Sequence, residues 1–90
     1  MIYGVYAVRD AQTGYLVPFT EVNDGAAARG FQYAVLRQDD NLFFSNPMDY
    51  ALYRIADYDT DTGLLTRQNK YPVLVVDATS IVAKSNSVER

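Results

Sequence analysis

Cysteine and histidine, the side chains that most often serve as nucleophiles, bases and metal ligands, are both absent from this 90-residue sequence. Disulfides, thiolate nucleophiles and sulfur or imidazole metal sites are therefore excluded, and no side chain has an ordinary pKa near neutrality. The five glycines are scattered, so the sequence has no phosphate-binding loop and no nucleophile elbow. We expect a protein that is not an enzyme, with no catalytic residue and no cofactor.

Aspartate is the remaining side chain that could bind a metal or move a proton. Asp57, Asp59 and Asp61 have the spacing that opens a calcium loop, but the residues after them lack the required glycine and glutamate. They are more typical of a solvated turn, in which short acidic side chains accept hydrogen bonds from the nearby backbone. The carboxylates between residues 39 and 49 could supply an acid–base pair, but nothing in the sequence places them in a pocket. We expect no metal site.

Aromatic residues are abundant, and eight Tyr with four Phe exceed what a small core needs. Aromatic rings interleaved with cations on an open sheet can stack on bases, for about 1–3 kcal/mol each, while Arg and Lys contact phosphates. On this argument the candidate nucleic-acid-binding residues are Arg9, Arg29, Tyr53, Arg54, Tyr58, Arg67 and Lys70. Taken alone, these residue types are more typical of core edges or of an oligomer interface.

The charge balance limits how the chain could bind a polyanion. Eleven acidic and eight basic residues give a net charge of −3 and a pI near 4.6. Such a chain does not attract DNA non-specifically, so any nucleic-acid binding would need a local basic patch. A chain of this length buries only about 60–65% of its unfolded surface. Because its stability would be modest without a partner, we expect a homo-oligomer, most simply a dimer.

Strand-type composition alternates with turn residues along most of the chain. Pro18 marks the edge or end of a strand, because proline cannot donate to a ladder. The last β-branched run could be buried on both faces, and residues 77–83 could either continue it or form a short helix. Strands are predicted over residues 2–8, 15–19, 51–58, 64–68 and 73–76.

One helix is predicted over about residues 24–37. Asn23 can accept a hydrogen bond from the free N–H groups at its start. Gly30 costs the helix roughly 1 kcal/mol relative to alanine, and close packing is its expected explanation. The apolar stripe that would face a sheet consists of Ala27, Phe31, Ala34 and Val35.

These elements predict an α+β domain over residues 1–84, followed by a frayed tail over residues 85–90. The expected architecture is an antiparallel sheet of four to five strands in the order β-β-α-β-β-β, with the helix packed on one face. An OB-like curled sheet is the alternative, since five short strands and one helix also fit it. No signal peptide or membrane span is expected, because the apolar runs are short.

Four short motifs follow one another along the chain: Pro18-Phe19, Asn23-Asp24-x-x-Ala27-x-Arg29-x-Phe31, Asn46-Pro47-x-Asp49-Tyr50-x-Leu52-Tyr53-x-Ile55 and Asp59-x-x-Thr62-Gly63. Taken together, their order and spacing resemble the small nonstructural, DNA-binding protein of gokushovirus-type microviruses. The resemblance covers residues 3–65. It weakens at Ala56, where a glycine is common in that family, and from Lys70 onward.

The resemblance implies a non-enzymatic bacteriophage protein that binds single-stranded DNA. It would act in genome replication or in the switch to single-stranded genome synthesis, in the cytoplasm of the host bacterium. Arg29 and Tyr53 lie on matched positions, and Arg54 is their neighbour. The alternative is a protein-interaction module that docks a viral replication or capsid protein through an exposed β edge or aromatic patch.

Overall fold

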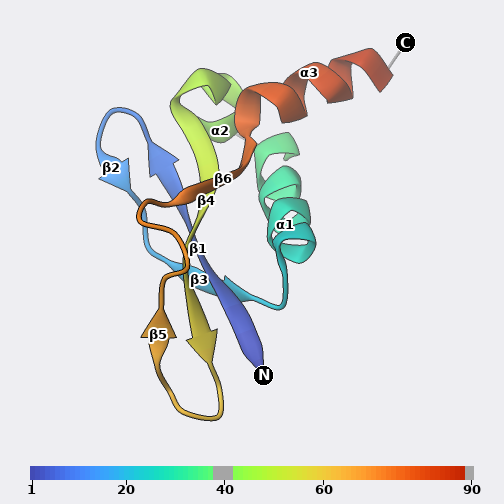
Figure 1. Cartoon of the computed structure of the whole chain (residues 1–90). Helices are drawn as coiled ribbons and strands as arrows, with labels where there is room; N and C mark the ends of the chain where they lie inside the picture. Colours follow the sequence, from blue (N-terminus) through green and yellow to red (C-terminus); the bar gives the residue numbers. More distant parts are fainter. Residues whose placement is uncertain (38–41, 89–90) are drawn as a thin grey trace.

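The computed structural model describes residues 1–37 and 42–88 and has an α+β architecture with one open antiparallel sheet (Figure 1). Its α+β class and antiparallel sheet are as predicted, with three short helical segments beyond the one expected. In chain order the elements are β1 (Ile2–Asp10), β2 (Gly14–Tyr15), β3 (Phe19–Glu21), α1 (Asp24–Leu36), α2 (Leu42–Ser45), a 3-10 turn (Pro47–Asp49), β4 (Tyr50–Asp59), β5 (Leu65–Thr66), β6 (Val73–Asp77) and α3 (Ala78–Val88).

The two longest strands, β1 and β4, form the centre of the sheet and pair antiparallel along their whole length. Each outer edge is made of two short strands. β2 and β3 pair with β1, whereas β6 and β5 pair with β4. The outer strands do not pair with one another, so the sheet stays open and is not the OB-like alternative.

The strand predicted over residues 15–19 is interrupted, and this accounts for a sixth strand. Pro18 lies in the interruption, where it cannot donate a ladder hydrogen bond. Val17 beside it is 84% exposed. The edge therefore pairs as β2, breaks at the proline and pairs again as β3. The prediction for residues 64–68 was also too long, since only Leu65 and Thr66 pair with β4.

Helix α1 covers one face of the sheet and provides three residues of the core. The side chain of Asn23 accepts from the Ala26 N–H at 2.8 Å, as predicted for its cap. Three residues of the predicted stripe, Ala27, Phe31 and Val35, are buried against the sheet. The core cluster consists of Tyr6, Val8, Ala27, Phe31, Val35, Tyr50, Leu52, Ala78 and Ile81.

The connection after α1 is held against the core by Phe43. Its ring lies 5.8 Å from that of Phe31 and 4.8 Å from that of Tyr50. Residues 38–41, including two of the carboxylates considered for acid–base work, lie outside the described residues.

The C-terminal segment differs from the prediction. Residues 85–88, assigned to a frayed tail, are helical, because α3 runs from Ala78 to Val88. Asp77 caps this helix by accepting from the Ser80 N–H at 2.7 Å. The many serines and the asparagine of this segment are not typical of a helix, so the composition did not predict the helix over its full length. Residues 89–90 lie outside the described residues.

The preceding strand β6 is an edge strand and is not buried on both faces. Val73 is 44% and Leu74 is 51% exposed. In the described residues, no helix is long and apolar enough to cross a membrane.

Gly4 is required by the position of Tyr6. A Cβ built on Gly4 would collide with the Tyr6 hydroxyl and lie 2.6 Å from Cε1 of its ring. Tyr6 is fully buried and cannot move without opening the core. We expect Gly4→Ala to lower the free energy of unfolding by about 1–3 kcal/mol in urea denaturation.

Gly30→Ala is the matched control for this substitution. A Cβ at Gly30 would meet no atom within 4 Å, so close packing is the wrong explanation for this glycine. Since alanine is the better helix former, Gly30→Ala should stabilise by about 0.5–1 kcal/mol. Equal effects of the two substitutions would contradict the role given to Gly4.

Candidate nucleic-acid interface

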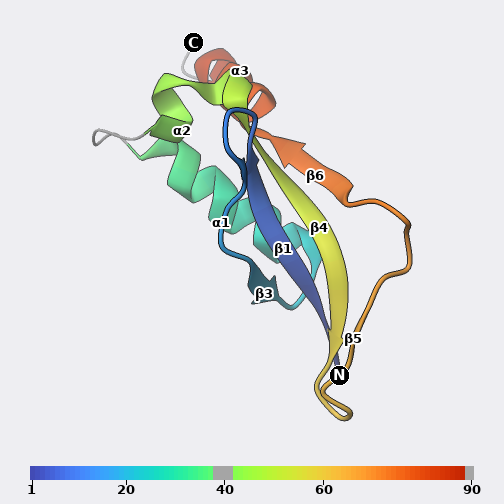
Figure 2. The ribbon, with the colours of Figure 1, turned by 90° about the vertical axis from the view of Figure 1, so that its left-hand side faces the viewer.

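The face of the sheet turned away from α1 carries a group of aromatic side chains. Side chains alternate between the two faces of a strand, and the core residues Tyr6 and Val8 point toward α1. The odd-numbered residues of β1 and their cross-strand partners therefore point the other way. Figure 2 views the sheet from this side. We call this surface the open face and define it by Tyr3, Arg9, Tyr15, Tyr53, Tyr58, Leu65 and Leu74.

The side chains of the open face form two clusters along β1. At one end the rings of Tyr15 and Tyr53 meet edge to face with centroids 5.7 Å apart, and the Arg9 guanidinium lies 5.9 Å from the Tyr15 ring. At the other end Tyr3 stands directly opposite Tyr58. Tyr15 is 46% exposed, and no helix covers either cluster. The Tyr15 ring is thus open to stacking by a planar ligand, whereas Tyr3, Tyr53 and Tyr58 are half-buried.

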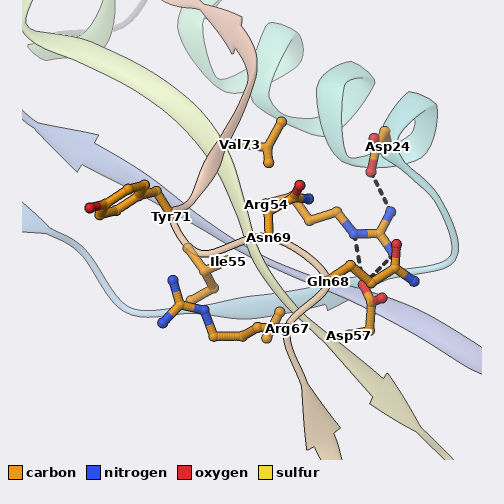
Figure 3. Close-up of a pocket in the computed structure, with 10 residues that line it drawn as sticks. Asp24, Arg54, Ile55, Asp57, Arg67, Gln68, Asn69, Tyr71 and Val73 are labelled. Carbon is orange, nitrogen blue, oxygen red and sulfur yellow. Dashed lines mark hydrogen bonds and ion pairs between the residues drawn. The ribbon is translucent and has the colours of Figure 1, made fainter.

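The loop between β5 and β6, residues 67–72, adds two cations at the border of the open face. The Arg67 guanidinium donates to the Lys70 carbonyl oxygen at 2.5 Å, and the Lys70 ammonium lies 5.6 Å from the centre of the Tyr71 ring. Arg67 and Tyr71 point away from α1 (Figure 3). Within the described residues, neither Arg67 nor Lys70 forms an ion pair with a carboxylate.

A β-bulge in β4 determines which side chains reach the open face. The register shifts between Val5 and Tyr6, so Ile55 has no partner in β1. Strict alternation would place Arg54 and Tyr58 on the same face. The bulge separates them, because one extra residue reverses the alternation beyond it. Tyr58 therefore lies on the open face, whereas Arg54 stands opposite Tyr6 on the α1 side.

Arg54 is bound by two carboxylates on the α1 side. Its Nε and Nη2 donate to one oxygen of Asp57, at 2.9 and 2.6 Å. Its Nη1 donates to Oδ1 of Asp24 at 2.7 Å, and the Tyr6 hydroxyl donates to the same oxygen at 2.6 Å. The guanidinium also lies 5.7 Å from the centre of the Tyr6 ring. We call Tyr6, Asp24, Arg54 and Asp57 the polar network; it joins the first turn of α1 to the sheet (Figure 3).

The polar network shifts the pKa of its members in opposite directions. Burial and the hydrogen bond to Asp24 raise the pKa of Tyr6 far above its ordinary value. The hydrogen bond from Tyr6, followed by the contact with Arg54, lowers the pKa of Asp24. Asp24 thus remains charged and Tyr6 neutral over the physiological range.

The predicted binding residues are divided by the structure. Arg9, Tyr53 and Tyr58 share the open face, with Arg67 and Lys70 on the adjoining loop. Arg54 is held in the polar network. Arg29 is exposed on α1, about 200° around the helix from the buried Ala27, and faces away from the sheet. Tyr3 and Tyr15 belong to the open face but were missing from the candidates, although both lie in predicted strands.

Carboxylates lie on both faces of the sheet. By register, Glu21, Asp57 and Asp59 lie on the α1 side of the strands. Asp77 lies near Arg9 at the border of the open face, where it caps α3, and Asp49 lines the same pocket as Arg9 and Tyr53. A ligand on the open face would therefore be separated by the sheet from three carboxylates of the described residues.

The acidic turn after β4 has the bonding expected of a solvated turn. The Asp59 side chain accepts from the Asp61 N–H at 2.8 Å, and Asp57 is occupied by Arg54. No group of three potential ligands that could hold a metal ion occurs in the described part of the chain.

The family described as Phage ORF5 protein matches this chain over residues 3–81. The chain belongs to this family. It is therefore a bacteriophage protein, and the match includes all six strands, α1 and the start of α3. The residues from Lys70 to Ile81, which the sequence motifs left unassigned, are included as well. No curated protein and no solved structure matches the chain.

Removing Arg54 should destabilise the fold, because it would leave the buried Asp57 carboxylate without a partner. We expect Arg54→Ala to lower the free energy of unfolding by about 2–3 kcal/mol in urea denaturation. Arg29→Ala, which removes an exposed guanidinium from α1, should change it by no more than about 0.5 kcal/mol. Similar effects of the two substitutions would show that the polar network contributes nothing to stability.

The lowered pKa of Asp24 predicts a loss of stability in acid. Because the carboxylate binds protons less readily in the folded state, its contribution is present above the unfolded pKa of about 3.9 and is lost as the pH falls through the folded pKa. Urea denaturation at a series of pH values should show this decline, and Asp24→Asn should flatten it. An unchanged acid slope in Asp24→Asn would contradict the assignment.

Proposed function

We propose that this phage protein binds single-stranded DNA without catalysis, through the open face. The observation that carries the proposal is a sheet face that no helix covers, bearing four tyrosines and bordered by Arg9, Arg67 and Lys70. Proteins that hold single strands combine stacking rings with cations that follow the backbone. The resemblance to the gokushovirus-type DNA-binding protein supports the same function.

The geometry suggests how a strand would lie. One tyrosine cluster lies at Tyr3 and the other at Tyr53, which pairs with Ala7. Tyr3 and Ala7 are four residues, or about 13 Å, apart on β1. Bases would stack on both clusters, while Arg9 at one end and the cations of loop 67–72 at the edge contact phosphates. Stacking is tolerant of sequence, because every base has a flat aromatic face.

Three of the acidic residues would not face a strand bound on the open face. The carboxylates Glu21, Asp57 and Asp59 lie on the other side of the sheet, so a strand on the open face is separated from them by the backbone. We propose that the protein acts in the cytoplasm of the host bacterium, in replication of the phage genome or in the switch to single-stranded genome synthesis.

A protein-interaction module is the second candidate, and a specific observation favours it. The hairpin and strand at the β4 edge expose apolar side chains, including Leu64 at 61%, Leu65 at 66% and Leu74 at 51%. Such an edge suits a viral replication or capsid protein, or a second copy of the chain in a homodimer. Binding to a protein through this edge would be insensitive to salt.

The proposal predicts that tyrosines of the open face determine DNA affinity. Fluorescence anisotropy of a labelled strand of roughly 30 nucleotides should show saturable binding that exceeds binding to duplex and weakens with salt. Tyr53→Ala should remove about 1–3 kcal/mol of binding free energy, or roughly 5- to 150-fold in affinity. No binding at low salt would reject the function for the isolated protein.

Tyr33→Ala is the matched control, because Tyr33 lies on α1 and is 75% exposed. Its loss should leave the affinity unchanged. Arg67→Ala should also reduce the slope of log affinity against log salt by about 0.7, whereas Arg29→Ala should not. If Tyr33→Ala weakened binding as much as Tyr53→Ala, the open face would not be the binding surface.

A further inference from the structure

A pocket of about 260 Å³ lies at the β4 edge of the sheet, between β5 and β6. β4 pairs with β5 at Asp57–Tyr58 and with β6 at Ala51–Arg54, which leaves Ile55 and Ala56 without a partner on this edge. Loop 67–72 bows away from this stretch (Figure 2). The resulting pocket is lined by Arg67 and Tyr71 on one side and by Asp24, Arg54 and Asp57 on the other (Figure 3).

The charges that line the pocket cancel. It contains two guanidinium groups, from Arg54 and Arg67, and two carboxylates, from Asp24 and Asp57. Arg54 is already paired with both carboxylates. A phosphate would therefore gain little attraction and would meet the two acidic groups. A neutral ligand that forms hydrogen bonds suits the pocket better.

The pocket offers hydrogen-bonding atoms that the protein itself does not use. All hydrogen bonds to the side chains of Asp24 and Asp57 end on Oδ1, so within the described residues Oδ2 of each remains available as an acceptor. Within the described residues, the side-chain amides of Gln68 and Asn69 also make no hydrogen bond. Figure 3 shows these amides on the same side as Arg54 and Asp57.

We propose that this pocket receives a single base with an exocyclic amino group, preferring cytosine to thymine, from the strand bound on the open face. This inference rests on the proposed function. Carboxylates accept hydrogen bonds from the N4 amino group of cytosine. Thymine has a carbonyl oxygen at the same position, which cannot donate and would face another acceptor. The amides of Gln68 and Asn69 can donate to the ring nitrogen or the carbonyl of the base.

The route from the open face to the pocket runs past Arg67 and Tyr71. Both side chains line the pocket and point away from α1 (Figure 3). Arg67 would hold the phosphate of the nucleotide whose base turns over the sheet edge, while Tyr71 stacks on a neighbouring base. The open face thus gives affinity for any single strand, and the pocket adds a preference for one base.

The test compares oligo-dC with oligo-dT of equal length, because the two pyrimidines differ mainly at position 4. In anisotropy competition at neutral pH, oligo-dC should bind about five- to tenfold more tightly. The double variant Gln68→Ala/Asn69→Ala removes the donors to the cytosine ring nitrogen and should lower this ratio by about two- to threefold, because the carboxylates remain, while leaving the affinity for oligo-dT unchanged. Gln32→Ala, which removes an exposed amide from α1, is the control and should keep the ratio.

The outcomes distinguish a failure of the base pocket from a failure of the proposed function. Equal binding of the two oligonucleotides, with Tyr53→Ala weakening both, would overturn the base pocket and leave the proposed function intact. A preference for oligo-dC that is the same in the double variant as in the wild type would overturn the pocket as its source. Failure of the wild-type protein to bind either oligonucleotide would reject the function and the pocket together. Thermal unfolding of the double variant should match wild type, since both side chains are exposed.

Discussion

One oxygen of Asp24 accepts hydrogen bonds from both Tyr6 and Arg54, and this contact sets the position of α1 on the sheet. The Tyr6 ring reaches that oxygen only by crossing the space above Gly4, where a side chain would obstruct it. Arg54 points to the same side as the core residue Leu52, and the bulge at Ile55 turns Asp57 toward that side, so that both carboxylates reach the guanidinium. The glycine, the bulge and the shared carboxylate oxygen therefore contribute together to one joint between helix and sheet.

The same bulge gives the sheet two different faces. On the α1 side it brings together charged groups that neutralise one another beside an apolar core. On the open face it brings Tyr58 into line with Tyr53 of β4 and with Tyr3 of β1. The irregularity thus creates both the joint that fixes the helix and the aromatic surface proposed to bind DNA, as is common for bulges near functional sites.

Elements that depend on neighbouring residues could be predicted from the sequence. Features that depend on contacts between distant residues could not. The cap at Asn23, the stripe through Phe31 and the five main strand segments could be predicted because each depends on neighbouring residues. The bulge depends on how β1 and β4 align across the sheet, and no residue pattern within 51–58 predicts it. Strict alternation therefore placed Arg54 beside Tyr58, and a residue that joins helix to sheet was included among the DNA-binding candidates.

The central ladder joins strands that are far apart in the chain, since Asp10 pairs with Tyr50 and Ile2 with Asp59. Closing such a loop costs conformational entropy before any contact repays it, so the assembly of β1 with β4 is expected to limit the folding rate. During synthesis the first strand can pair early with β2 and β3, but it must wait for β4 until more than half of the polypeptide has emerged from the ribosome. Tyr3 and Tyr58 come together only at that late step, so a partly made chain lacks the complete open face.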